Sequence, residues 1–234
     1  SNPPAPKDAF SEENDYWDTM IALKKINAAD ISRVVRKIDW TSGTTYEMYR
    51  DDYSRSNISP QTSSTTLYDA NYYVMNQDYR VYICLQNGTN PENTEGRPSL
   101  DEPLFTDLEP RSAGASGDGY VWKYLFTINP NQLIKFDSTS FIPLPADWKT
   151  SSDVAAVRNN ATTSGQLKIV TITGRGVGYG TAATYNNVPL LGDGQGGKCS
   201  VVVNAAGKID SVEVTSGGSN YTFANVGLGN VGLN

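Results

Sequence analysis

Two segments of the chain alternate their side chains with the period of a β-strand, residues 80–85 and residues 120–128. Side chains point to opposite faces of a strand in turn, so one face of the second segment is entirely aromatic or aliphatic. That face consists of Tyr120, Trp122, Tyr124, Phe126 and Ile128, and the opposite face of Val121, Lys123, Leu125 and Thr127. We expect the aromatic face to pack in a core, because a sugar-binding platform would need exposed rings.

The last third of the chain contains two copies of a strand, a glycine turn and a tyrosine. The strands are residues 169–173 and 211–215, and the glycine turns after them end at Tyr179 and Tyr221. Residues 199–203 predict a further strand between the copies. The pattern indicates a small repetitive β module beginning near Thr150, in which each tyrosine packs over its own glycine turn.

Two short helices are expected near the N-terminus. Within residues 16–23, Trp17, Met20 and Ile21 recur at helical spacing, and Asp30 could cap a second helical turn. That second turn would carry Ile31, Val34, Val35 and Ile38. Its basic residues would be Arg33, Arg36 and Lys37, forming either a solvated face or a face for an acidic partner.

Two segments are candidates for interfaces. Residues 1–6 are rich in proline and lack apolar periodicity, which is typical of an extended arm that lies on another surface. Residues 87–117 are rich in Pro, Gly and acidic side chains, and a loop of this length in a compact domain is usually functional or bound to a partner.

The composition supports a mainly β fold. The 234 residues include 14 Tyr, 21 Gly and 12 Pro, which favours many short strands over long helices. We predict a layered β-sandwich with short helical insertions over residues 1–149, followed by a Gly/Tyr-rich β repeat module over residues 150–234. The chain lacks a starting Met and stops within a Gly-Asn-rich run, so we expect this module to continue beyond residue 234.

The residue types exclude several kinds of chemistry. The chain has no histidine, which removes Ser-His-Asp and Cys-His nucleophiles, histidine zinc sites and histidine proton shuttles. Cys84 and Cys199 are expected to be buried thiols, with a single disulfide as the alternative. The net charge of −6 argues against nucleic acid as a partner, and no apolar run reaches the roughly 18 residues of a transmembrane helix.

Carboxylates are the remaining candidates for catalysis. The close pairs are Asp51 with Asp52, Asp101 with Glu102, and Asp107 with Glu109. A glycosidase needs two carboxyls facing each other across a cleft, which adjacency in sequence does not establish. The glycines of residues 174–179 lack the last glycine of a dinucleotide loop, and residues 192–197 fit a hairpin better than a calcium repeat. We assign no catalytic, cofactor-binding or metal-binding residue.

One long segment resembles a known family. Residues 117–128, Gly-Asp-Gly-Tyr-Val-Trp-Lys-Tyr-Leu-Phe-Thr-Ile, are similar to the corresponding segment of the gene-eight baseplate wedge proteins of T4-type contractile-tailed bacteriophages. Supporting matches in the same order are Asp39-Trp40, Val81-Tyr82, Cys84-Leu85 and residues 142–145. The resemblance covers roughly residues 16–148, and the opening residues are more similar to cyanophage members. The Gly-Tyr repeats after Thr150 depart from the T4 pattern.

The resemblance implies a structural, non-catalytic component of the virion. Such a protein assembles in the host cytoplasm into the tail baseplate, contacts other wedge proteins, forms a homodimer within each wedge, and binds neither nucleic acid nor membrane. Its interfaces hold the wedge and rearrange when sheath contraction is triggered. The alternative function is a tail-associated carbohydrate-binding module for the host, which exposed Tyr179, Tyr185 and Tyr221 on one surface would support. A carboxylate hydrolase is a third reading.

Overall fold

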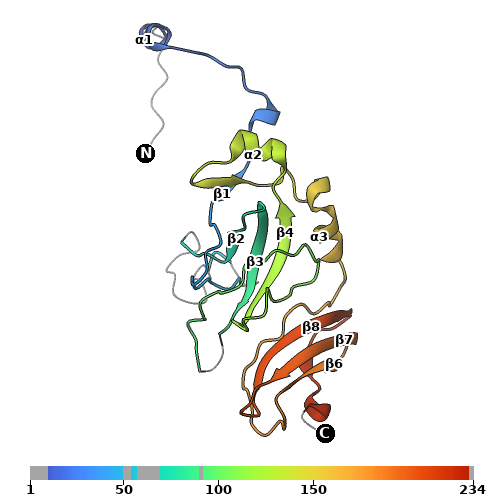
Figure 1. Ribbon diagram of the computed structural model, residues 1–234. Coiled ribbons are helices and arrows are strands. Elements are labelled where there is room, and N and C mark those ends of the chain that lie inside the picture. Colours follow the sequence, from blue (N-terminus) through green and yellow to red (C-terminus); the bar gives the residue numbers. More distant parts are fainter. Residues whose placement is uncertain (1–9, 50–53, 57–68, 90–91, 232–234) are drawn as a thin grey trace. The chain divides into compact units, whose positions relative to one another are not determined.

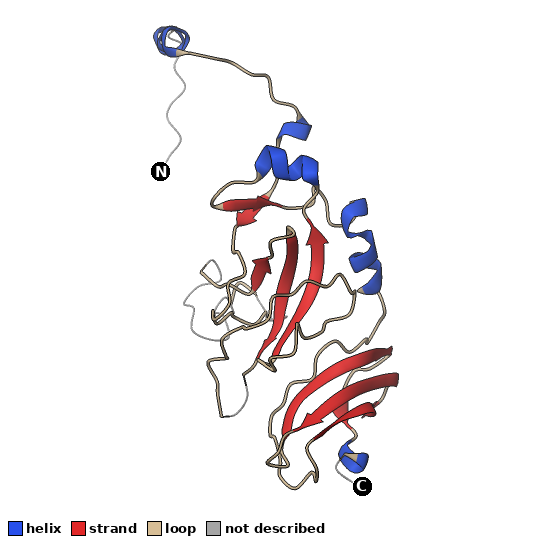
Figure 2. Ribbon diagram, in the orientation of Figure 1, coloured by secondary structure: helices blue, strands red, loops and turns tan. Residues whose placement is uncertain are grey.

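The computed structural model describes residues 10–49, 54–56, 69–89 and 92–231 (Figure 1). The chain divides into two compact units, Ser1–Ser32 and Arg33–Asn234. It is mainly β, with 31% strand, 13% helix and several antiparallel sheets, which confirms the predicted fold class (Figure 2). The predicted boundary at residue 150 falls inside the second unit and stays a prediction.

The first unit contains two short helical elements. They are the helix α1 (Ser11–Thr19) and the 3-10 turn η1 (Ala28–Asp30). The helix therefore begins earlier and ends earlier than residues 16–23. Asp30 does not cap a following helical turn: it is the third residue of η1, and its carboxylate caps the start of η1 by accepting a hydrogen bond from the backbone N–H of Asn27 at 3.0 Å.

The second predicted helix is wrong. The residues that would have formed it are instead the strand β1 (Val34–Arg36), which pairs antiparallel with β5 (Phe141–Pro143). Two adjacent β-branched valines favour extended backbone, and the distant partner strand supplies their hydrogen bonds. The basic face is dispersed as a result, because Arg36 donates to the carbonyls of Asp69 and Ala70 while Lys37 pairs with Asp137.

The centre of the second unit is an antiparallel sheet of order β2-β3-β4. Its strands are β2 (Tyr73–Met75), β3 (Arg80–Asn87) and β4 (Tyr120–Thr127), so both strands predicted from alternation are confirmed. The helices that follow are α2 (Pro130–Phe136), η2 (Ser152–Val154) and α3 (Ala155–Asn160). Asn129 caps α2 by accepting a hydrogen bond from the Asn131 N–H, and proline stands at the first helical position.

Two hydrophobic cores pack against this central sheet. The first is aromatic and consists of Tyr46, Val74, Tyr82, Cys84, Ala113, Tyr120 and Trp122. The second consists of Met75, Val81, Phe126, Ile128, Ile142 and Val154. Register shifts interrupt the β3–β4 pairing, and the residues of β4 are divided between the two cores.

The remaining strands form a curled half-barrel of order β8-β7-β6-β9. Its elements are β6 (Ala183–Gly192), β7 (Gln195–Val203), β8 (Ile209–Ser219), β9 (Ala224–Val226) and the 3-10 turn η3 (Leu228–Asn230). Predicted strands 199–203 and 211–215 lie within β7 and β8. Predicted strand 169–173 is wrong, because these residues are extended but belong to no sheet. The core of the half-barrel is aliphatic and separate from the two central cores.

Candidate interaction surfaces

The aromatic residues of β4 form a core, as expected, and not a surface platform. Tyr120 and Trp122 are fully buried, stacked on each other with ring centroids 5.3 Å apart, and Tyr46 meets Trp122 edge-on at 5.6 Å. The Tyr120 hydroxyl donates to the Arg97 carbonyl at 2.6 Å and accepts from the Tyr46 N–H at 2.8 Å. Burial raises the pKa of Tyr120 well above its ordinary value, so the hydroxyl stays protonated.

The Gly-Asp-Gly turn before β4 is shaped by close backbone contact. Asp118 is buried, and its carboxylate accepts hydrogen bonds from the N–H groups of Leu100 at 2.8 Å and Tyr120 at 3.0 Å. Gly119 has a φ of +86°, and a side chain there would lie 2.8 Å from the Cα atom of Gly88. The segment that carries the family resemblance therefore builds the fold and fastens the loop 87–117.

The loop 87–117 follows the surface of its own domain, apart from residues 90 and 91, which lie outside the described part. Side chains of the central sheet bind its carbonyls. Tyr82 donates to Phe105 at 2.6 Å, Lys123 to Leu108 at 2.9 Å, and Asn76 to Pro103 at 2.9 Å. Leu100 and Leu104 in the same loop are 52% and 55% exposed. The loop is thus held on one side and presents apolar side chains on the other.

The carboxylates considered for hydrolysis are held by local partners. Asp101 accepts from the Ser116 N–H at 2.8 Å, Glu102 from the Gln77 N–H at 3.3 Å, and Asp107 pairs with Arg111 at 3.0 Å. Asp51 and Asp52 lie outside the described residues. The remaining carboxylate, Glu109, has partners of its own.

Glu109 is part of a polar cluster with Lys168 and Asn160. Its carboxylate lies 2.7 Å from the Lys168 ammonium group and 2.8 Å from the Asn160 amide. Burial raises its pKa, but the hydrogen bonds from Asn160 and Lys168 outweigh burial and hold the pKa below its ordinary value. A glycosidase general acid needs the opposite shift, whereas the Glu109 carboxylate forms an ion pair with Lys168.

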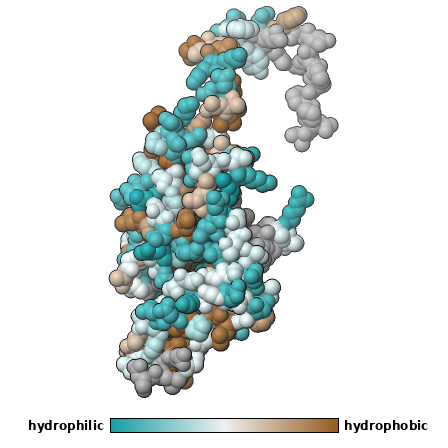
Figure 3. Space-filling model, turned by 90° about the vertical axis from the view of Figure 1, so that its right-hand side faces the viewer, coloured by the Kyte–Doolittle hydropathy of each residue, from teal (hydrophilic) through white to brown (hydrophobic). Residues whose placement is uncertain are grey.

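The first unit has a large share of exposed apolar side chains. The predicted arm, residues 1–6, lies outside the described residues. In the described part of the unit, large apolar side chains are exposed (Figure 3). The most exposed large side chains are Phe10 at 75%, Tyr16 at 69%, Trp17 at 66%, Ile21 at 101%, Leu23 at 77%, Ile26 at 64% and Ile31 at 66%. Exposed apolar groups at this density are typical of a segment that docks on another protein.

The tyrosines of the predicted repeats pack over glycines. Tyr221 is 7% exposed, and its hydroxyl accepts from the Gly197 N–H at 3.1 Å and donates to the Leu190 carbonyl at 3.0 Å. Added side chains at Gly194 and Gly218 would collide with its ring, as one at Gly176 would with the Tyr179 ring. This packing confirms that the repeat tyrosines pack over their glycine turns. Sugar stacking would need Tyr179, Tyr185 and Tyr221 exposed on one surface, and Tyr221 is buried.

The Gly-rich residues 192–197 form the hairpin that joins β6 to β7, as predicted. Asp193 in this turn accepts hydrogen bonds from the N–H groups of Thr222 at 2.9 Å and Phe223 at 3.2 Å, and from the Thr222 hydroxyl. The Thr222 bonds are the main cause that lowers the Asp193 pKa to about 2. Within the described ranges, no three His, Cys, Asp or Glu side chains gather as metal ligands would.

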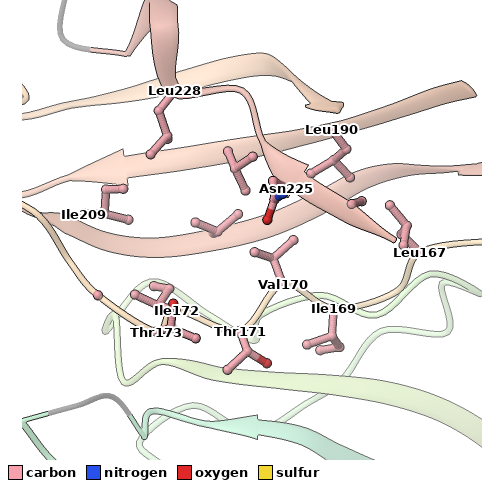
Figure 4. A pocket seen from close by; sticks show the side chains of 14 residues that line it. Leu167, Ile169, Val170, Thr171, Ile172, Thr173, Leu190, Ile209, Asn225 and Leu228 are labelled. Atoms are coloured by element: carbon pink, nitrogen blue, oxygen red, sulfur yellow. The ribbon is translucent and has the colours of Figure 1, made fainter. Parts of the chain in front are cut away.

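The half-barrel contains a pocket of about 350 Å³ whose lining side chains are mainly aliphatic (Figure 4). One wall is the extended segment 167–174, and the others come from β6, β8, β9 and η3. In Figure 4, Val170 points across the pocket toward Asn225. The volume exceeds the about 150 Å³ that holds a benzene molecule in a protein core, so the pocket has room for several aliphatic groups. Sequence reasoning missed it, because its walls are far apart along the chain.

Both cysteines are free and buried, which confirms the expected thiols and excludes the disulfide alternative. No helix in the described parts of the chain is long and apolar enough to cross a membrane. The chain matches no protein-family profile, no curated protein sequence and no solved structure.

Proposed function

We propose that this chain is a structural, non-catalytic component of the baseplate wedge of a contractile phage tail. It joins neighbouring wedge proteins, forms a homodimer within each wedge, and changes its contacts when sheath contraction is triggered. The observation that carries the proposal is the similarity of residues 117–128 to the gene-eight wedge proteins.

The chemistry of that segment agrees with a structural role. Tyr120 and Trp122 are buried, and Asp118 binds backbone N–H groups, so these side chains are occupied in building the domain. The surfaces left for partners are apolar, namely the described part of the first unit and the outer side of the loop 87–117. Apolar contacts of this kind can be exchanged without breaking a covalent or metal bond, which suits an assembly with two arrangements.

Cross-linking mass spectrometry on purified tails tests the proposal. The most informative lysines are the exposed Lys24, Lys25, Lys149 and Lys198. Lys168 and Lys123 serve as internal controls, because the first is paired with Glu109 and the second with the Leu108 carbonyl. We expect links from Lys24 and Lys25 to other wedge proteins, and a different set of links after contraction.

Links only to fibre proteins, or none to any tail protein, would overturn the wedge assignment. The homodimer is tested separately by mixing isotopically labelled and unlabelled chains before cross-linking, which distinguishes links within a chain from links between copies. Mixed-isotope links are expected, and their absence would contradict the dimer. A glycan array with the purified chain tests the alternative, host carbohydrate binding.

A further inference from the structure

The half-barrel has an opening, here called the seam, between the extended segment 168–174 and the strand β9 (Ala224–Val226). The segment 168–174 forms the first side of the seam. The segment is fixed beside β8 at its ends, where Leu167 N–H donates to the Gly217 carbonyl at 2.9 Å and Ile209 N–H donates to the Arg175 carbonyl at 3.0 Å. Between these two bonds, none of the described residues forms a backbone-to-backbone hydrogen bond with the segment. The Val170 carbonyl accepts a single side-chain bond, from Gln86 at 3.4 Å.

The sequence of this side is that of a strand without a partner. Residues 169–173 read Ile-Val-Thr-Ile-Thr, and β-branched residues of this kind are favoured in sheets. Isolated extended backbone leaves its N–H and C=O groups to water, whereas a neighbouring strand would pair them. The segment is therefore ready to join a sheet.

The other side of the seam is β9. This strand pairs with β6 along one edge only and ends the sheet order, so its second edge is free among the described strands. All three residues of β9 and the consecutive residues 169–174 line the pocket of about 350 Å³. Because successive strand residues point in opposite directions, a lining made of consecutive residues means that the two backbones themselves border the pocket.

The pocket has no ionisable side chain among its lining residues. We therefore expect an uncharged occupant, since a charge removed from water is unfavourable where no side chain of opposite charge can pair with it. A hydrocarbon chain would match the aliphatic side chains of the lining but could not pair the backbone groups of the segment and β9. An extended peptide matches both, through its main chain and through side chains of alternating direction.

We propose that the seam between residues 168–174 and β9 is a strand-acceptor site. An uncharged segment of another protein, with apolar side chains at alternate positions, inserts between the two edges and closes the half-barrel. Its backbone pairs with the segment on one side and with β9 on the other, and its apolar side chains fill the pocket. This inference rests on the half-barrel alone and holds whether or not the chain belongs to a tail.

A donor strand attached to the full chain tests the proposal. A flexible Gly-Ser linker followed by Thr-Val-Thr-Val-Thr-Val-Thr is added after Asn234, close in sequence to Leu228, which lines the pocket. Attachment gives the strand a high effective concentration, so no natural partner is needed. The matched control replaces alternate threonines of the added strand by proline, which removes backbone donors but keeps the valines.

Amide hydrogen exchange is measured at residues 169–173 and 224–226. We expect exchange to slow by about tenfold or more with the Thr-Val strand relative to the proline control. Equal exchange in the two proteins would overturn the proposal. If the two proteins are equally protected relative to the chain without an added strand, the pocket accepts apolar side chains without strand pairing, which also contradicts the proposal.

A second variant shows whether the added strand occupies the seam. Val170→Trp places a large ring in the pocket, and Val177→Trp places the same ring at a position that is 75% exposed. The Thr-Val strand should lose its protective effect in the first variant and keep it in the second. Protection that persists in Val170→Trp would show that the strand packs elsewhere and would contradict the site.

Discussion

The central sheet and the half-barrel stabilise themselves by different means. The central sheet has an aromatic core, and hydroxyls of that core reach out to hold a long loop, as Tyr120 does through the Arg97 carbonyl. The half-barrel has an aliphatic core, with one buried tyrosine seated among glycines. In the central region, side chains of the sheet bind carbonyls of the loop, whereas in the half-barrel residues 168–174 have no backbone-to-backbone hydrogen bond among the described residues. The two regions therefore offer different features to a partner: exposed apolar side chains on the loop of the central region, and unpaired extended backbone in the half-barrel.

The largest effect is expected from Trp122→Ala. Truncating this fully buried ring leaves a cavity against Tyr46 and Tyr120, and removal of a buried aromatic side chain typically costs about 3–5 kcal/mol. Urea unfolding measures the loss, and Trp148→Ala, at a position 42% exposed, is the control. Hydrogen exchange should speed up in β3 and β4 first, and an equal acceleration in β7 would break the distinction between the two regions.

Gly119→Ala should come next. A positive φ costs an ordinary residue about 1–2 kcal/mol, and forcing atoms into a packed site adds about 1–3 kcal/mol. Both apply at Gly119, whereas Gly117 has a φ of +69° with nothing within 4 Å of an added side chain. Thermal or urea unfolding should show Gly119→Ala as clearly less stable than Gly117→Ala. Equal losses would mean that close backbone approach does not fasten the turn.

Tyr221→Phe examines the polar tie inside the half-barrel. The variant keeps the ring but leaves the Gly197 N–H and the Leu190 carbonyl without this partner, which should cost about 1–3 kcal/mol. Tyr185→Phe is the matched control, because that hydroxyl makes an exposed bond to the Thr181 carbonyl at 3.3 Å. Urea unfolding measures the free energy of unfolding of both variants. If Tyr185→Phe loses as much stability as Tyr221→Phe, the two buried hydrogen bonds of the Tyr221 hydroxyl make no particular contribution.

The smallest effect concerns pH. The Asp193 pKa falls from its ordinary 3.8 to about 2 in the folded chain, so the unfolded chain binds more protons between these values. The stabilisation by this carboxylate is therefore present above pH 3.8 and is lost as the pH falls toward 2. Asp193→Asn should lower the melting temperature at neutral pH and converge with the unmodified chain near pH 2. A difference independent of pH would contradict this account.

The sequence predicted the parts of the fold that depend on local pattern. Alternation in β3 and β4 was sufficient because each strand presents an apolar face to a core. The start of α2, with Asn129 as its N-cap and Pro130 as its first residue, was a readable signal that the sequence interpretation did not use.

What failed depended on distant partners. Val34 and Val35 were assigned to a helix, but β5 turns them into a strand. Residues 169–173 have the β-branched composition of a strand and still form no ladder, because among the described residues this part of the chain is hydrogen-bonded to the β8 backbone only at the flanking Leu167 and Arg175. The pocket unites Val170 with Val226, and no periodicity connects positions so far apart.

The two buried cysteines give each region its own probe of local opening. Cys84 lies in the aromatic core and Cys199 in the aliphatic one, and burial raises the pKa of both thiols, to about 11 for Cys199. Only the thiolate reacts with alkylating reagents, so each sulfur should report the moments at which its own core opens to water. The alkylation rates of Cys84 and Cys199 in the unmodified chain can therefore be measured with one reagent. Unequal rates would show that one region opens while the other stays closed.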